Sequence, residues 1–371
     1  MKKKKLVFIL NNFLIGGTER VLLEIIKNLD RNRFEINIVT VFGSGPIEIE
    51  FRKLGIPIFL AGPKKYYSSL PFKMIWILSI PLILLRLIVF LRKINPDIII
   101  TSLYEADILG IFSSWLLGIK KRIIIYHDTH KVSAIRWVIR KIFSLNLSYK
   151  IIAVAPNVKR FLINYWGISK DKVIIILNGI DFQKFELGKK SLEPNLILGF
   201  IGRFVPDKNP ECFLRALVVL KKKYNLEPEV IMVGGGKLEL NLKQFASHNN
   251  LNNIEFTGLA NDIVKWLKKI DVLIVPSKEE GLPLIVLEGL ASNKIVVASN
   301  IRSIKDLISS GKNGILFRAG DANSLSEELK DLLTDSSLVK NYYYNVNQWI
   351  NENKQLFDIK DVSKRYLDVL N

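Results

Sequence analysis

The sequence contains one cysteine and three histidines among its 371 residues. A single cysteine, Cys212, excludes an intrachain disulfide and is typical of a reducing compartment. It falls in an expected helix, so we interpret it as a small core residue rather than a nucleophile. No Asp-x-Asp occurs in the chain, which argues against a divalent metal held by such a pair. We therefore expect no metal and no other cofactor.

Two further patterns are missing. The chain has no G-x-G-x-x-G dinucleotide fingerprint, which counts against a dehydrogenase. It also has no convincing signal peptide, because the apolar run Leu6–Leu10 that follows Lys2–Lys5 is short and meets two asparagines. These absences predict a cytoplasmic protein.

Acidic residues are scarce in the first half only. Residues 1–190 carry 31 Lys and Arg against 13 Asp and Glu, whereas residues 191–371 carry 23 against 22. A basic half indicates an anionic partner, such as a membrane surface, a phosphorylated substrate or nucleic acid, or else a solvated basic surface. We find no nucleic-acid motif or aromatic platform, so nucleic acid is not an expected partner.

Short apolar runs alternate with helical stretches along the first half. The run Leu6–Leu10 precedes a loop at 11–17 and a helix that Thr18 can cap. The alternation predicts a parallel sheet with helices on both faces. The other strands expected in this half are Phe34–Val41, Asp97–Ser102, Arg122–Tyr126, Ile151–Val154 and Val173–Leu177.

The alternation restarts after a linker expected near residues 182–194, where Asn209 can cap a helix that starts at Pro210. We predict an α/β fold with two Rossmann-like doubly wound domains, 1–185 and 186–350, and a C-terminal helix at 351–371 that packs back toward the first domain. The crevice between such domains is the expected ligand site. The strands expected in the second domain are Leu196–Ile201, Val230–Val233, Ile254–Phe256, Val272–Val275 and Ile295–Ala298.

Met74–Leu91 is almost entirely apolar. A transmembrane helix is disfavoured, because one crossing would put strands of the same sheet on opposite sides of the bilayer. A buried core helix and a helix dipping into a membrane face both remain open.

The stretch Lys131–Lys150 has the pattern of a basic amphipathic helix that can lie on anionic lipid, although an ordinary half-exposed helix fits too. Its apolar residues at helical spacing are Val132, Ile135, Val138, Ile139, Ile142 and Leu145, and its cations include Lys131, Arg136 and Arg140, with Trp137 beside them.

A strand–loop–helix unit at Val272–Gly289 carries the most specific chemistry. Glu280 lies just before the helix expected to start at Pro283, and Glu288 lies inside it. The amides of Gly281, Leu282 and Leu284, near the helix start, form a site that attracts phosphate. Carboxylates accept hydrogen bonds from hydroxyl pairs, so the two glutamates could hold the sugar and the ribose of a nucleotide sugar with its diphosphate between them.

Residues 202–210, GRFVPDKNP, follow the first strand of the second domain. Arg203 and Lys208 leave the carboxyl end of that strand, where two cations could neutralise a departing diphosphate without a metal.

Two sites in the first domain complete the candidates. Gly16 and Gly17 stand where a strand turns into a helix, so backbone amides there can approach a ligand closely. His127 follows the strand Arg122–Tyr126, where a neutral imidazole could hydrogen-bond a sugar hydroxyl. A structural histidine is the alternative.

Taken together, these residues resemble the retaining, two-Rossmann-domain (GT-B) glycosyltransferases of family 4. The resemblance rests on an ordered set of motifs: GGTER at 16–20, His127, NGID at 178–181, GRFVPDKNP at 202–210, VGGG at 233–236, FTG at 256–258, EGLPLIVLE at 280–288 and NGILF at 313–317. Asn293-Lys294 and Ala155-Pro156 depart from the family pattern, which leaves the donor-base pocket open.

The resemblance implies roles for these residues. Glu280 would hold the donor sugar and Glu288 the ribose. The diphosphate would be bound by Arg203, by Lys208 and by the backbone of residues 202 and 281–284. His127 would lie beside the transferred sugar, and Gly16 and Gly17 near the phosphates and the acceptor, with the donor bound mainly by the second domain and the acceptor by the first.

The function we expect is metal-independent transfer of a hexosyl group, with retained configuration, from a nucleotide-diphosphate sugar. The acceptor would be a glycan or a polyprenyl-diphosphate-linked saccharide in cell-surface polysaccharide synthesis, reached by peripheral binding to the anionic inner face of the cell membrane. The alternatives are a nucleotide-sugar epimerase of similar fold and, more remotely, a basic nucleic-acid-binding protein.

Overall fold

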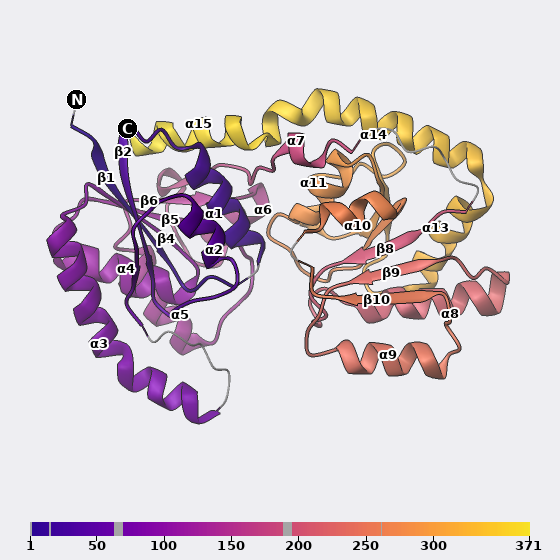
Figure 1. The fold of residues 1–371 in the computed structure, drawn as a ribbon, viewed down its shortest axis with the longest axis horizontal. Coiled ribbons are helices and arrows are strands. Elements are labelled where there is room, and N and C mark those ends of the chain that lie inside the picture. Colours follow the sequence, from indigo (N-terminus) through magenta and orange to yellow (C-terminus); the bar gives the residue numbers. More distant parts are fainter. Residues whose placement is uncertain (1, 15, 63–69, 188–194, 261) are drawn as a thin grey trace. The chain divides into compact units, whose positions relative to one another are not determined.

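The computed structural model describes residues 2–14, 16–62, 70–187, 195–260 and 262–371, with the side chains of 70–78 left out. The chain forms two compact units (Figure 1). Unit 1 comprises Met1–Gly179 together with Ile359–Asn371, and unit 2 comprises Ile180–Asp358. Part of the linker expected near 182–194 is a short helix, α7 (Phe182–Phe185), and residues 188–194 lie outside the described part of the chain.

Unit 1 is built on a parallel sheet of seven strands in the order β3-β2-β1-β4-β5-β6-β7. The apolar runs form strands because a parallel sheet covered on both faces buries nearly every side chain. The three-residue strand β3 was not anticipated from the sequence. The strands are β1 (Lys4–Leu10), β2 (Phe34–Thr40), β3 (Ile58–Leu60), β4 (Ile98–Ser102), β5 (Lys121–Tyr126), β6 (Lys150–Ala153) and β7 (Val173–Ile175).

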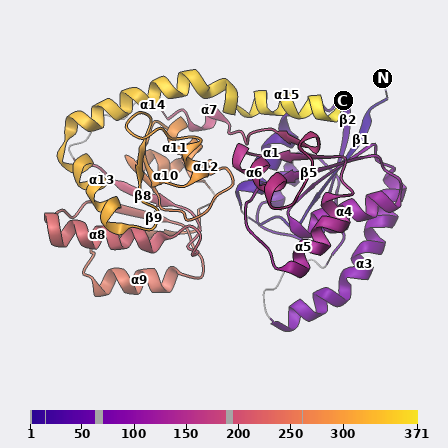
Figure 2. The same ribbon diagram turned by 180° about the vertical axis from the view of Figure 1, so that it is seen from behind.

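Helices cover both faces of this sheet. Figures 1 and 2 show α1 and α15 on one side and α3, α4 and α5 on the other. A π-helical turn, η1 (Lys141–Leu145), continues α5. The helices are α1 (Gly17–Asn28), α2 (Glu48–Lys53), α3 (Leu70–Ile94), α4 (Tyr104–Leu116), α5 (Ala134–Arg140), α6 (Pro156–Asn164), the 3-10 turn η2 (Lys170–Lys172) and α15 (Ile359–Leu370).

Unit 2 has a parallel sheet in the order β10-β9-β8-β11-β12-β13. Its strands are β8 (Leu198–Ile201), β9 (Val230–Val233), β10 (Ile254–Gly258), β11 (Val272–Val275), β12 (Ile295–Ser299) and β13 (Ile315–Phe317), the last not anticipated. The helices that follow α7 in this unit are α8 (Pro210–Tyr224), α9 (Glu239–His248), α10 (Val264–Lys269), α11 (Leu284–Ala291), α12 (Arg302–Lys305), α13 (Ala322–Thr334) and α14 (Ser336–Phe357). The predicted fold class, two doubly wound parallel-sheet domains, is confirmed.

Each sheet has one point at which the strand order reverses direction. In unit 1 this point lies between β1 and β4, and in unit 2 it lies between β8 and β11. Loops leaving the carboxyl ends of such a strand pair diverge and leave room for a ligand. The candidate residues after β8 and β11 therefore lie at the place where an α/β unit binds ligands.

Three local expectations about helix ends need correction. Helix α1 begins at Gly17 with Gly16 as its N-cap, so Thr18 is not the cap. Helix α11 begins at Leu284, because Pro283 has extended backbone angles and stands at the N-cap. The C-terminal segment is two helices, because the chain is extended at Asp358 between α14 and α15.

Helix α3 contains the apolar segment at 74–91, of which the side chains of 74–78 lie outside the described part. From Ser79 onward it is one-sided: Ile83, Leu87 and Leu91 are buried in the core of unit 1, whereas Leu82 and Leu85 are exposed. Among the described residues no helix is long and apolar enough to cross a membrane.

Candidate functional site

Lys208 and Glu280 meet at the point of reversal in unit 2. The Lys208 ammonium donates a hydrogen bond to Glu280 Oε1, forming an ion pair that is mostly shielded from solvent. Ser277 Oγ, itself buried, donates to the same oxygen at 2.7 Å. The carboxylate of Glu280 is thus oriented from both strands that flank the reversal, β8 and β11.

The loops that carry these residues are pinned by backbone contacts. The amide of Lys278 donates to the carbonyl of Asp207 at 2.8 Å, which joins the loop after β11 to the loop after β8. A Cβ at Gly234, where φ is +149°, would lie 1.9 Å from the carbonyl oxygen of Gly202. Glycine is therefore required at Gly234 for close packing of two loops, which accounts for part of the VGGG motif.

Helix α11 runs from this point into unit 2. The first amides of a helix have no intrahelical acceptor, and here Gly281, Leu282 and Pro283 lead directly into the first turn at Leu284. Glu288 lies further along the helix and is buried. The structure thus places Glu280 ahead of the helix N-terminus and Glu288 within the helix.

Arg203 and Gly202 lie at the end of β8. Arg203 is exposed and makes no ion pair with the described residues. A Cβ at Gly202 would meet only the Phe200 ring, at 3.4 Å, so the fold itself tolerates a side chain there. Unlike Gly234, Gly202 has no structural requirement of its own, which leaves ligand approach as a reason for glycine.

His127 follows β5 in unit 1. Its Nε2 is buried and has no hydrogen-bond partner among the described residues. Burial, reinforced by the nearby Arg140 charge, lowers the pKa of His127 to about 3. The imidazole is therefore neutral at physiological pH and can donate to or accept from a hydroxyl group.

Acidification from pH 7 to pH 5 is expected to destabilise unit 1 through His127. The unfolded imidazole takes up a proton below its ordinary pKa of 6.5, whereas the folded one stays neutral down to about 3. Because the unfolded state then binds more protons, the free energy of unfolding falls as pH falls, here by on the order of 1–2 kcal/mol. The raised pKa of Asp107 acts in the opposite direction, but Asp107 is present in every variant, so urea unfolding at both pH values should show a less favourable change on acidification for the wild type than for His127→Asn. Asparagine at exposed His248 is the control, and equal losses in all three proteins would contradict the expectation.

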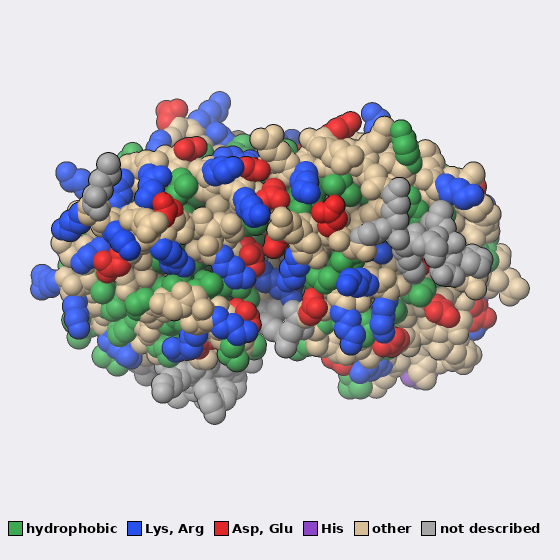
Figure 3. Space-filling model, turned by 45° about the horizontal axis from the view of Figure 1, so that its top comes forward, with side chains coloured by type: hydrophobic (Ala, Val, Ile, Leu, Met, Phe, Trp, Pro, Cys, Tyr) green, Lys and Arg blue, Asp and Glu red, His purple; other side chains and the backbone are tan. Residues whose placement is uncertain are grey.

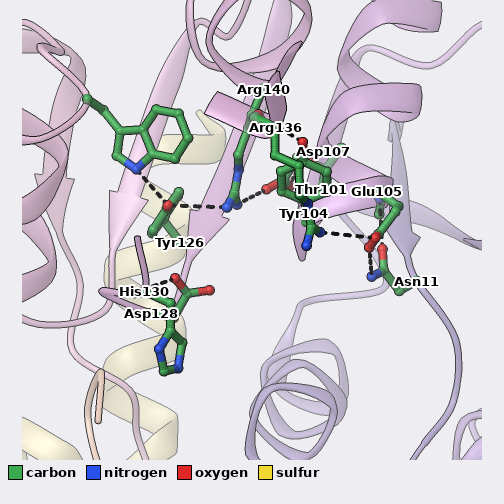
Figure 4. A network of polar contacts seen from close by, with 12 residues as sticks. Asn11, Thr101, Tyr104, Glu105, Asp107, Tyr126, Asp128, His130, Arg136 and Arg140 are labelled. Atoms are coloured by element: carbon green, nitrogen blue, oxygen red, sulfur yellow. Dashed lines mark hydrogen bonds and ion pairs between the residues drawn. The ribbon is translucent and has the colours of Figure 1, made fainter. Parts of the chain in front are cut away.

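A buried polar network surrounds the hydroxyl of Tyr126, the residue before His127 (Figure 4). Arg140 donates to Asp107 Oδ2 at 2.6 Å and to the Tyr126 hydroxyl at 3.2 Å, and Thr101 donates to the other oxygen of Asp107 at 2.7 Å. Trp166 Nε1 donates to the Tyr126 hydroxyl at 2.8 Å. Burial raises the pKa of Asp107 to about 6, against the opposing charge of Arg140, so the pair is ionised at neutral pH.

Gly16 and Gly17 form the start of α1. Gly16 has extended backbone angles, which any residue adopts. A Cβ there would meet the Glu19 carboxylate at 2.4 Å, a flexible group that can shift. As at Gly202, neither backbone conformation nor packing of the fold requires glycine at this position.

Two family models match consecutive parts of the chain. One, described as Glycosyltransferase Family 4, matches residues 15–184, and the other, Glycosyl transferases group 1, matches residues 181–349. The chain is a family 4 glycosyltransferase. The predicted family and the GT-B fold are confirmed.

Relatives of this glycosyltransferase include enzymes whose names specify lipid-linked acceptors. It is 27% identical over 380 residues to the Escherichia coli UDP-Gal:alpha-D-GlcNAc-diphosphoundecaprenol alpha-1,3-galactosyltransferase, covering 96% of this chain and 95% of that one. It is 27% identical over 302 residues to the Campylobacter jejuni N,N'-diacetylbacillosaminyl-diphospho-undecaprenol alpha-1,3-N-acetylgalactosaminyltransferase, covering 75% and 77%. An uncharacterized glycosyltransferase of Methanocaldococcus jannaschii matches at 29% over 195 residues, and the chain spans about half of that protein (52%).

Solved structures share the fold. Anabaena HepE in complex with UDP and glucose superposes with a TM-score of 0.82 at 20% identity, over 99% of both chains. A glycosyltransferase from Rickettsia africae gives 0.78 at 20% identity, over 99% of this chain and 98% of that one.

Sequence reasoning missed two features of the glycosyltransferase. The Asp107–Arg140 pair was not anticipated, although Asp107, the second of two acids at the start of the otherwise apolar helix Tyr104–Leu116, was a signal for it, because buried acids are almost always paired. Arg140 was grouped with cations that could face lipid, which is wrong, because its side chain is buried. Ser277, which donates to Glu280, was not among the candidate residues.

Proposed function

We propose that this glycosyltransferase transfers a hexosyl group from a nucleotide-diphosphate sugar, with retained anomeric configuration and without a metal. The observation that carries the proposal is the Glu280 carboxylate, held by Lys208 and Ser277 where β8 and β11 diverge. A carboxylate whose orientation is fixed in this way can accept a further hydrogen bond from a sugar hydroxyl, because each carboxylate oxygen has two lone pairs. Glu288, buried on α11, would accept from the ribose.

Lys208, Arg203 and the first turn of α11 supply positive potential for a diphosphate. As the bond between the anomeric carbon and the phosphate oxygen breaks, negative charge grows on that oxygen. The Lys208 ammonium oriented by Glu280, the exposed Arg203 guanidinium and the helix amides would stabilise that charge without a metal.

The acceptor hydroxyl would attack the same face of an oxocarbenium-like species, forming the new bond from its oxygen to the anomeric carbon. Its proton would pass to the departing phosphate oxygen. His127 stays neutral, so it serves as a hydrogen-bond partner of a sugar hydroxyl through Nε2 rather than as a cation. Gly16 and Gly17 would give the ligand close access to the backbone of unit 1.

Removing either cation should slow the reaction while preserving the fold. Arg203→Ala and Lys208→Ala are each expected to raise the barrier by about 2–4 kcal/mol, because each loses charge that acts on the leaving group. Initial rates of nucleotide release, with the donor first chosen by thermal shift across UDP-, GDP- and ADP-sugars, measure this. Lys278→Ala, an exposed cation in the same loop system, is the matched control. Rates within threefold of the wild type in both site variants would contradict the proposal that Arg203 and Lys208 stabilise the leaving diphosphate.

The stereochemical proposal has its own test. NMR of the product at early times should show the anomeric configuration of the donor. An inverted product would overturn the retaining mechanism while leaving the donor site in place.

We further propose peripheral association with the anionic inner face of the cell membrane, where a polyprenyl-diphosphate-linked saccharide in cell-surface polysaccharide synthesis would be the acceptor. Figure 3 shows Lys and Arg side chains spread over the visible face of unit 1. The α5–η1 segment exposes Ile135 at 74%, Val138 at 46% and Ile142 at 49%. Exposed apolar side chains on a basic unit favour an interfacial location.

Flotation with vesicles tests this association. The wild type should float with vesicles containing phosphatidylglycerol and should be released by high salt, because the attraction is partly electrostatic. Ile135→Ser/Ile142→Ser should reduce the bound fraction severalfold, since it removes apolar area from the proposed contact. Leu240→Ser, at an exposed leucine of unit 2, is the control. Equal flotation of the variant and the control would exclude α5–η1 as the contact.

A further inference from the structure

The α5–η1 segment has its apolar side toward solvent and a cation toward the core. Ile135, Val138, Ile139, Ile142 and Phe143 are exposed, whereas Arg140 is only 4% exposed. The π turn that starts at Lys141 adds a residue to the helical repeat, closed by the Asn146 amide donating to the Lys141 carbonyl at 2.9 Å. Such turns often occur at functional sites. Around this turn Arg140 points inward, Ile142 and Phe143 are exposed, and the chain is buried again at Ser144 and Leu145.

Inside unit 1, Arg140 contacts side chains of α4, of the end of β5 and of the segment that follows α6. It pairs with Asp107 of α4 and donates to the Tyr126 hydroxyl, and its guanidinium lies 4.2 Å from the Tyr126 ring centre. It also lies 5.3 Å from the Tyr104 ring and 5.8 Å from the Trp166 ring. A planar, delocalised cation suits this combination of hydrogen bonds and ring faces.

Tyr126 is the last residue of β5 and directly precedes His127. Its hydroxyl is held by two donors, Arg140 and Trp166, so the strand end is fixed from the α5 side. A second branch also leaves α5: Arg136 lies 3.5 Å from Glu105, which accepts from Asn11 at 2.7 Å in the loop that leads to Gly16 (Figure 4). Helix α5 is thereby connected both to the end of β5, which precedes His127, and to the loop that leads to Gly16.

We propose that Arg140 is a positioning residue that links docking of the α5–η1 apolar side on lipid to the backbone at His127. The inference rests on the proposed membrane association. Contact with lipid would order α5–η1, and Arg140 would carry that ordering through Tyr126 to the end of β5. Substrate sites in unit 1 would then be completed at the membrane surface, where a lipid-linked acceptor is found.

Hydrogen exchange measures this link without any substrate. Peptides covering residues 121–130 are followed with and without phosphatidylglycerol vesicles, in the full chain. We expect the wild type to show exchange slowed on the order of threefold or more on vesicle binding, because local opening becomes rarer. In Asp107→Asn/Arg140→Met, which keeps the volumes and leaves no buried charge, flotation should persist while the response at 121–130 disappears.

Controls separate this role from a purely structural one. A structural role would change exchange equally with and without vesicles, whereas positioning removes only the vesicle response. Lys141→Met, at the neighbouring cation, should respond as the wild type does. Arg140→Lys, which keeps the charge, provides the same readout if the double variant does not fold. A preserved response in the folded Arg140 variants overturns the inference, as does wild-type flotation without any response. Absence of wild-type flotation overturns the membrane proposal and this inference with it.

Discussion

Glu280→Gln is expected to reduce turnover by about 10²–10³-fold, the usual scale for removing one organised polar group from a reacting site. The amide keeps the size of the side chain but loses the charge that orients Lys208, and it can no longer accept from Ser277 and a sugar hydroxyl in the same way. Rates of nucleotide release at saturating and at low donor concentration separate an effect on kcat from one on KM.

The neighbouring Glu279 provides the matched control, because Glu279→Gln makes the same chemical change one residue away. Both variants should have the circular dichroism spectrum and melting temperature of the wild type within a few degrees. Near-normal activity of Glu280→Gln would refute the assignment of this carboxylate to the donor site. An equal loss in both variants would point to the loop as a whole.

Arg140→Met should be among the most destabilising single changes in unit 1. It leaves the Asp107 carboxylate, which is 0% exposed, without its cation, and removing one partner of a buried pair costs about 3–5 kcal/mol. Asp107→Asn/Arg140→Met should recover most of that loss, because neither charge is left alone. Urea unfolding followed by tryptophan fluorescence measures the cycle, with the transitions of the two units fitted separately.

An exposed ion pair in unit 2 is the control for the stability changes in this mutant cycle. Glu239 and Lys243 lie 2.8 Å apart on the surface of α9, and Glu239→Gln should change stability by less than about 1 kcal/mol. If Arg140→Met costs no more than that, the pair does not hold unit 1 together. If the double variant is as unstable as the single, packing around the pair rather than its charges determines stability.

Most strands could be predicted from the sequence because each lies in an apolar run. This holds even for β7, which has only three residues, because its apolar run extends to Leu177. The apolar run at Leu6–Leu10 lies within β1, which pairs with two neighbours. Strands β3 and β13 have three residues each, too few to show a pattern. Helix ends were less predictable because a cap depends on backbone angles: Thr18 has a capping side chain, yet the chain enters the helix at Gly17.

The candidate site shows the same division. Lys208 follows β8 and Glu280 follows β11, and each could be recognised from the strand before it. The two residues meet although they are 72 apart in sequence, because β8 and β11 are adjacent in the sheet. The orientation of α5 could not be predicted, because periodicity shows that a helix has two sides without showing which one faces the sheet. Arg140 was therefore assigned to the wrong side.

The division of the chain between the units has a consequence for synthesis and truncation. Unit 2 is one continuous stretch, Ile180–Asp358, whereas α15, which packs on α1, is made after all of unit 2. As the chain leaves the ribosome, unit 2 can complete its core while unit 1 still lacks the helix that packs on α1. A fragment ending at Asp358 should therefore retain a folded unit 2 beside an incompletely covered unit 1, and limited proteolysis should cut the two at different rates.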